Sequence, residues 1–97
     1  MDKAQRAQGE ILAEVPQAST AIIALDVSEP QSIREFGRRF SQQTGELDLL
    51  INNAGIVGTP LARNSVGHEM QLATNYLGAF ALTGTLLPFF SRTSRAR

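Results

Sequence analysis

The chain has 97 residues, of which 42% are hydrophobic and 19% charged, a composition typical of one globular domain at most. The formal net charge is zero and the pI is about 6.6, so no surface for nucleic acid is indicated; Arg92, Arg95 and Arg97 are expected to form a solvated tail. The absence of cysteine excludes a disulfide framework and a thiolate zinc site.

The amino terminus is polar and lacks the apolar core of a signal peptide. The most apolar stretch, 76–90, is shorter than the ~20 residues needed to span a bilayer. The sequence therefore predicts a cytoplasmic protein with no membrane partner.

Helical spacing of Ala4, Ala7 and Ile11 predicts an amphipathic helix over 3–14 that Pro16 ends. Residues 21–27 follow as a predicted strand with a charge, Asp26, near its carboxyl end.

The next four residues, 28–31, form a capping-box pattern in which Ser28 caps a helix and Gln31 reaches back. A helix over 29–43 follows, with Ile33, Phe36 and Phe40 on its buried face. Gly37 is expected to allow close packing, and Gly45 to supply a left-handed stop.

The apolar run 47–51 lies between two glycines and predicts a buried parallel strand. Asn52, Asn53, Ala54 and Gly55 follow at once. In open α/β sheets ligands bind beyond the carboxyl ends of strands, where small residues permit close approach and amides donate and accept. A tight turn rich in Asn and Gly is the alternative interpretation.

After a loop over 56–64, Ser65 is a candidate cap for a helix over 66–90, bent near 75–78 and again at Pro88. The order helix, strand, helix, strand, helix is typical of α/β units with right-handed crossovers.

Three motifs in fixed order resemble the middle of a short-chain dehydrogenase/reductase, a Rossmann-type family that binds NAD or NADP. They are the Asp26-Val27 pair, the Asn-Asn-Ala-Gly run over 52–55, and Asn75-Tyr76-Leu77-Gly78. The segments 67–71 and 80–83 are similar to the retinol dehydrogenase subgroup. The resemblance covers nearly the whole chain.

The resemblance implies a role for each matched residue. Asp26 would accept a hydrogen bond from the adenine amino group, and Val27 would pack beside the ring. Asn52, Asn53, Ala54 and Gly55 would lie along the adenosine ribose. Asn75 would be the asparagine of the catalytic tetrad, whose backbone carbonyl holds a water of the proton relay. Without the resemblance, Asp26 is also explained by a nearby helix dipole, and Asn75 by a plain kink.

Two further residues are not assigned to the site. His68 has no second histidine or cysteine to complete a metal site, so no metal is predicted. Tyr76 is followed four positions later by Phe80, whereas the family's catalytic tyrosine is followed at that offset by lysine.

The chain departs from the family in what it lacks. It contains no glycine-rich turn for the cofactor pyrophosphate, and its single lysine is Lys3. Residues 1–97 are therefore interpreted as an incomplete Rossmann-type domain, a fragment matching strands 3 and 4 of a doubly wound parallel sheet. Two other strands lie between these in that strand order, so the pair held here is not expected to form a sheet.

The sequence thus predicts a segment of an NAD(P)-dependent oxidoreductase acting on an alcohol or carbonyl, truncated and inactive alone. The alternative is a non-catalytic interaction module whose apolar helix over 66–90 packs against a second copy or a family relative.

Overall fold

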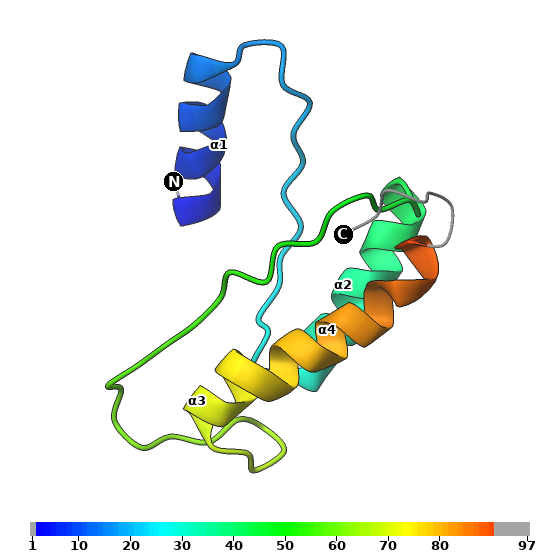
Figure 1. Cartoon of the computed structure of the whole chain (residues 1–97). Coiled ribbons are helices and arrows are strands. Elements are labelled where there is room, and N and C mark those ends of the chain that lie inside the picture. Colours follow the sequence, from blue (N-terminus) through cyan, green and yellow to red (C-terminus); the bar gives the residue numbers. More distant parts are fainter. Residues whose placement is uncertain (1, 91–97) are drawn as a thin grey trace.

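The computed structural model describes residues 2–90, so the predicted basic tail lies outside the described residues. Helices dominate the fold: α1 stands apart, while α2 lies beside a long helix that runs through α3, η1, α4 and η2 (Figure 1). Among the described helices none is both long and apolar enough to cross a bilayer.

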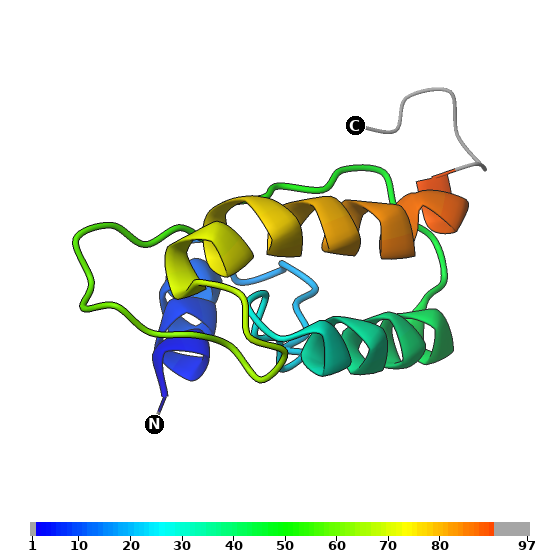
Figure 2. The ribbon, with the colours of Figure 1, turned by 90° about the horizontal axis from the view of Figure 1, so that it is seen from below.

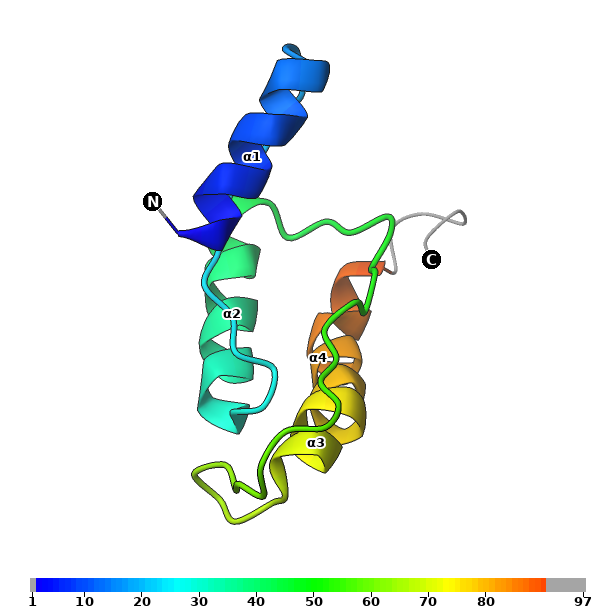
Figure 3. The same cartoon turned by 90° about the vertical axis from the view of Figure 1, so that its left-hand side faces the viewer.

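The first helix, α1, spans Lys3–Glu14 and confirms the predicted helix over 3–14. It begins in a capping box, because Asp2 Oδ1 accepts from the amide of Gln5 at 2.8 Å while the Asp2 amide donates to Gln5 Oε1 at 3.2 Å. No residue of α1 is buried, and the helix points away from α2 and α4 (Figure 3). It contacts the following segment through Gln8, whose Nε2 donates to Thr20 Oγ1 at 2.8 Å.

The second helix, α2, spans Pro30–Gln43, close to the predicted 29–43. The predicted capping box is wrong, because Ser28 Oγ donates to Asp26 Oδ1 at 2.6 Å and Glu29 occupies the cap position. Proline in the first turn makes a side-chain cap less necessary, since its missing N–H would be unsatisfied there anyway. At the other end Gly45 has a φ of 65°, which confirms the left-handed stop.

The long helix comprises α3 (Met70–Leu72), the π-helix η1 (Ala73–Gly78), α4 (Ala79–Leu86) and the 3₁₀-helix η2 (Leu87–Phe90). The predicted bends coincide with the π-helical turn and with the 3₁₀ turn that contains Pro88.

The predicted start at 66 with Ser65 as cap is wrong. Gly67 has a φ of 92°, which no helix accommodates, and Asn64 Oδ1 accepts from the amide of His68 at 2.9 Å. The cap is Glu69, whose carboxylate accepts from the amides of Gln71 and Leu72, both at 2.9 Å. These two hydrogen bonds lower the pKa of the Glu69 carboxyl.

The core lies between α2 and α4, which run side by side (Figure 2). Its buried cluster consists of Ile33, Leu82 and Leu86, with Phe36 and Phe40 half-buried beside it. A β-carbon at Gly37 would lie 2.6 Å from Thr85 Cγ2, so the predicted close approach is confirmed.

The two predicted strands, 21–27 and 47–51, are not formed: within residues 2–90 the structure contains no β-strand, and its single bridge pairs Arg63 with Glu69. Both segments run as open backbone (Figure 1), and Ile51 is 72% exposed. A strand requires a hydrogen-bonded neighbour, and neither segment supplies one to the other.

Candidate cofactor site

The side chain of Asn75 joins the long helix to the segment that follows 47–51. Its Oδ1 accepts from the amide of Ile56 at 2.8 Å, and its Nδ2 donates to the carbonyl of Ile56 at 2.7 Å. One asparagine thus satisfies both backbone groups of one residue, as a neighbouring strand would. Asn75 lies in η1, where the wider π-turn interrupts the regular helix, and π-turns occur frequently at functional sites.

Asp26 is exposed and is held by its own chain neighbours. Its Oδ1 accepts from the amide of Ser28 at 3.0 Å and from the Ser28 hydroxyl, and its amide donates to Ser32 Oγ at 2.7 Å. Its Oδ2 makes no hydrogen bond with any residue that the structure describes. The carboxylate is therefore held through one oxygen, and its other oxygen keeps its capacity to accept a hydrogen bond.

Residues 52–54 and Val27 line the same hollow. A hollow of about 150 Å³ is lined by Val27 together with Asn52, Asn53 and Ala54. Asn52 is fixed there, because its Nδ2 donates to Thr83 Oγ1 of α4 at 3.2 Å. Two separate motifs predicted to bind cofactor thus line one space.

Two predicted residues, Asp26 and Gly55, do not line this hollow. A β-carbon at Gly55 would lie 3.6 Å from Asn75 Oδ1, an ordinary contact distance, so in this structure space alone does not require glycine.

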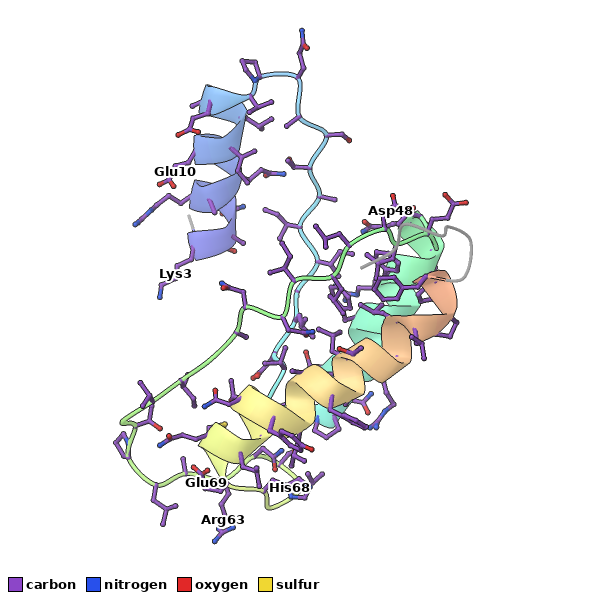
Figure 4. All side chains as sticks on the ribbon, viewed as in Figure 1. Lys3, Glu10, Asp48, Arg63, His68 and Glu69 are labelled. Carbon is purple, nitrogen blue, oxygen red and sulfur yellow. The ribbon has the colours of Figure 1, made fainter. Side chains whose placement is uncertain are left out.

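A second and larger hollow, of about 470 Å³, is also lined by Asn52. Its lining includes Asn52, Asn75, Tyr76 and Phe80. Tyr76 is 64% exposed. Lys3, the lysine of this chain, lies on α1, away from the long helix (Figure 4). The described residues therefore bring no lysine to a tyrosine, as catalysis in the family would require.

The sequence analysis missed Asn64, which anchors the loop before α3. It is buried, and its Nδ2 donates to the carbonyl of Ser28 at 2.7 Å. Ser65 extends this anchor, since its amide and hydroxyl both donate to the carboxylate of Glu29. The signal was an Asn three residues before Gly67, a pattern typical of a side chain that bonds nearby amides.

The same loop carries His68, and Figure 4 shows it beside Arg63 and Glu69. Within residues 2–90 no group of three or more His, Cys, Asp or Glu side chains is placed to hold a metal ion.

The model of the short chain dehydrogenase family matches residues 1–97. The chain belongs to this family. Retinol dehydrogenase 12 of Bos taurus is 37% identical over 95 residues, which cover 98% of this chain and 30% of that protein. The short-chain dehydrogenase/reductase drtF of Aspergillus calidoustus is 37% identical over 94 residues, covering 97% of this chain and 30% of its own. The predicted likeness to retinol dehydrogenases is confirmed.

Solved structures have a similar fold to this chain. An uncharacterised protein from Mycobacterium Paratuberculosis superposes with a TM-score of 0.65 at 39% identity, covering 87% of this chain and 30% of its own. A mutant of a Serratia marcescens short-chain dehydrogenase/reductase gives a TM-score of 0.66 at 21% identity, over 92% of this chain and 38% of its own, which shows the fold alone. The helices and open segments therefore occupy Rossmann-type positions, although residues 2–90 form no sheet. The chain spans about three tenths of the length of the curated relatives described.

The residues present fit part of an NAD(P) molecule. The second carboxylate oxygen of the exposed Asp26, which makes no hydrogen bond with the described residues, and the hollow beside Val27 suit the adenosine end, where hydrogen-bond acceptors and an apolar wall are needed. The pyrophosphate requires backbone amides in a glycine-rich turn at a helix amino terminus, and residues 1–97 contain no such motif.

Proposed function

We propose that this chain is a segment of an NAD(P)-dependent oxidoreductase that acts on an alcohol or carbonyl group, and that it contributes the adenosine side of the cofactor site and one catalytic-centre residue. The observation that carries the proposal is the pair of hydrogen bonds between Asn75 and Ile56, one in each direction, which fixes the helix bearing Asn75 on the backbone directly after Gly55. Relatives named retinol dehydrogenase support an alcohol or aldehyde as substrate.

Each matched residue has a defined task in this proposal. Asp26 accepts from the adenine amino group through Oδ2, and Val27 packs against the ring. The segment 52–55 lies along the ribose. NAD(P), when bound, supplies or accepts the hydride. Asn75 holds a water of the proton relay with its backbone carbonyl, while its side chain keeps the π-turn in place against Ile56.

We also propose that residues 1–97 alone neither catalyse nor bind the cofactor tightly. Catalysis requires an acid for the substrate proton and a group that adjusts its pKa, and Tyr76 has no lysine partner within reach. Single hydrogen bonds to a charged group such as Asp26 contribute about 1.5–3 kcal/mol, too little without a pyrophosphate site. The activity therefore requires this segment to be joined to a glycine-rich strand-turn-helix and to a Tyr-x-x-x-Lys segment.

Isothermal titration of the purified chain with NADH and NADPH tests the second statement. We expect no dissociation constant below roughly 100 μM, which corresponds to about −5.5 kcal/mol. Tighter binding would show that the chain assembles a cofactor site without the pyrophosphate cradle.

A chimera tests the first statement. Residues 1–97 replace the matching segment of bovine retinol dehydrogenase 12, and alcohol oxidation with NAD and NADP is measured. We expect activity, and we expect Asn75→Ala to lower kcat by on the order of 100-fold, as misplacing a catalytic group by about 1 Å does. The matched control is Gln71→Ala, which removes a side-chain amide one helical turn before Asn75. A folded chimera without activity, or equal activity in both variants, would contradict the proposal.

A second candidate function, a non-catalytic interaction module, is favoured by one observation. The face of the long helix that lines the larger hollow is apolar and open: Phe80 is 74% exposed, and Tyr76 and Leu87 lie on the same lining. Under this proposal residues 66–90 pack against a second copy or a full-length relative. Size-exclusion chromatography with and without such a relative tests it, since separate elution would leave only the enzyme segment.

A further inference from the structure

Gly78 makes a closer backbone contact than any side-chain-bearing residue would permit. It is buried at the end of η1, and a β-carbon built on it would lie 2.0 Å from the carbonyl oxygen of Val27 and 2.9 Å from the carbonyl carbon. The same β-carbon would lie 2.7 Å from the carbonyl oxygen of Ala73. All three atoms belong to the backbone, so no side-chain rotation relieves the overlap.

The other glycines of the two packed helices differ. At Gly37 the obstructing atom is a methyl group of Thr85, which can move by rotating a side chain. At Gly84, in α4, a β-carbon would meet nothing within 4 Å. The requirement for glycine at 78 is thus a property of that site and not of the helix as a whole.

The contact at Gly78 joins the two open segments through one helical turn. Three residues before Gly78, Asn75 binds the backbone of Ile56, and Gly78 itself rests on the backbone of Val27. No backbone hydrogen bond connects the segments 21–27 and 47–56 within the described chain. The π-turn therefore serves as a spacer where the sheet would otherwise set the distance.

We infer that Gly78 is a positioning residue: it sets the distance between the adenosine contact at Val27 and the reaction-centre residue Asn75. The close contact at Gly78 does not depend on the proposed function, but its effect on the reaction rate rests on that function. Any β-carbon at 78 must move the helix and the backbone of Val27 apart by about 1 Å to reach a permitted separation. A displacement of that size at a reacting centre costs up to about 100-fold in rate.

Hydrogen–deuterium exchange of the full 97-residue chain tests this, with Gly78→Ala compared with the control Gly84→Ala. The reporter is the amide of Ile56, which donates to Asn75 Oδ1 and exchanges faster when that bond lengthens. The internal reference is the set of amides in α2. We expect Gly78→Ala to raise exchange at Ile56 at least several-fold with α2 unchanged, and Gly84→Ala to change neither.

A purely structural role gives a different result, because general destabilisation raises exchange in α2 and at Ile56 together. If Gly78→Ala unfolds the chain, the measurement is repeated in trimethylamine N-oxide, which favours the folded state. Unchanged exchange at Ile56, or a rise shared equally with α2 under both conditions, overturns the inference. No cofactor or substrate is present, so the outcome is independent of whether the proposed oxidoreductase function holds.

Discussion

Replacing Leu86 by alanine is expected to separate α4 from α2. Leu86 is 1% exposed and is the largest fully buried side chain of the described residues. It belongs to one small cluster with Ile33 and Leu82. Truncating a buried leucine to alanine costs about 2–5 kcal/mol, of which the lost transfer free energy is one part and the cavity the other.

That cost is large relative to the free energy of unfolding expected for this chain. A chain of this size has a free energy of unfolding of about 5–15 kcal/mol, and the buried hydrophobic set here comprises only Ile33, Ala73, Leu82 and Leu86 among the described residues. The value is therefore expected near the lower limit. Losing about 2–5 kcal/mol removes between roughly two fifths and all of a stability near that limit, so Leu86→Ala should unfold at a much lower urea concentration than the wild-type chain.

Urea unfolding followed by circular dichroism measures the effect, at micromolar concentration to limit association. Leu87→Ala is the matched control, because Leu87 is the next residue and is 61% exposed. Its change should stay within about 0.5 kcal/mol. Alanine has the higher helix propensity, so a loss at Leu86 cannot come from the helix itself. Equal midpoints for the two variants would refute the placement of the core between α2 and α4.

Two further perturbations test the loop anchor and the surface charges. Asn64→Ala leaves the carbonyl of Ser28 without its partner and should lower the free energy of unfolding by about 1–3 kcal/mol in urea melts, whereas the exposed control Asn53→Ala should lower it far less. Arg38 and Arg39 lower the pKa of Glu35 to about 2 from 4.5. The charged carboxylate is therefore expected to stabilise α2 slightly above about pH 4.5, and this contribution should be lost as the pH falls toward about 2. The difference in urea midpoint between the wild-type chain and Glu35→Gln should shrink over that interval, and a difference independent of pH would contradict the ion pairs.

The helices that local chemistry specifies were predicted well. The spacing of Ala4, Ala7 and Ile11 gave α1, and the stop at Gly45 was visible because only a residue that tolerates positive φ ends a helix in this way. The start of the long helix was missed, because Asn64 takes the amides of Val66 and His68 through its Oδ1, and no propensity rule reports that competition.

The prediction of strands over 21–27 and 47–51 was wrong, because the residues of a segment do not by themselves decide whether it forms a strand. An apolar run such as 47–51 indicates a buried strand only when a sheet exists to bury it, and a sheet is a property of the neighbours. Here Leu47 bonds to the carbonyl of Phe89 at the end of the long helix, and Ile51 stays exposed. The family relationship could be recognised from the sequence, because the motifs at 26–27, 52–55 and 75–78 are short and can be identified without knowing what they contact.

In the candidate site, too, the motif residues could be found from the sequence but their contact partners could not. Asn75 was predicted from its motif, but its partner is the backbone of Ile56, and a backbone group carries no sequence signal. Gly78 was noticed as part of that motif, yet its requirement comes from the carbonyl of Val27, far away in the chain. Both partners lie on segments without a sheet, so their separation is set by the π-turn that carries Asn75 and Gly78. We therefore expect substitutions in η1 to disturb the spacing of the two motifs more than substitutions within the open segments themselves.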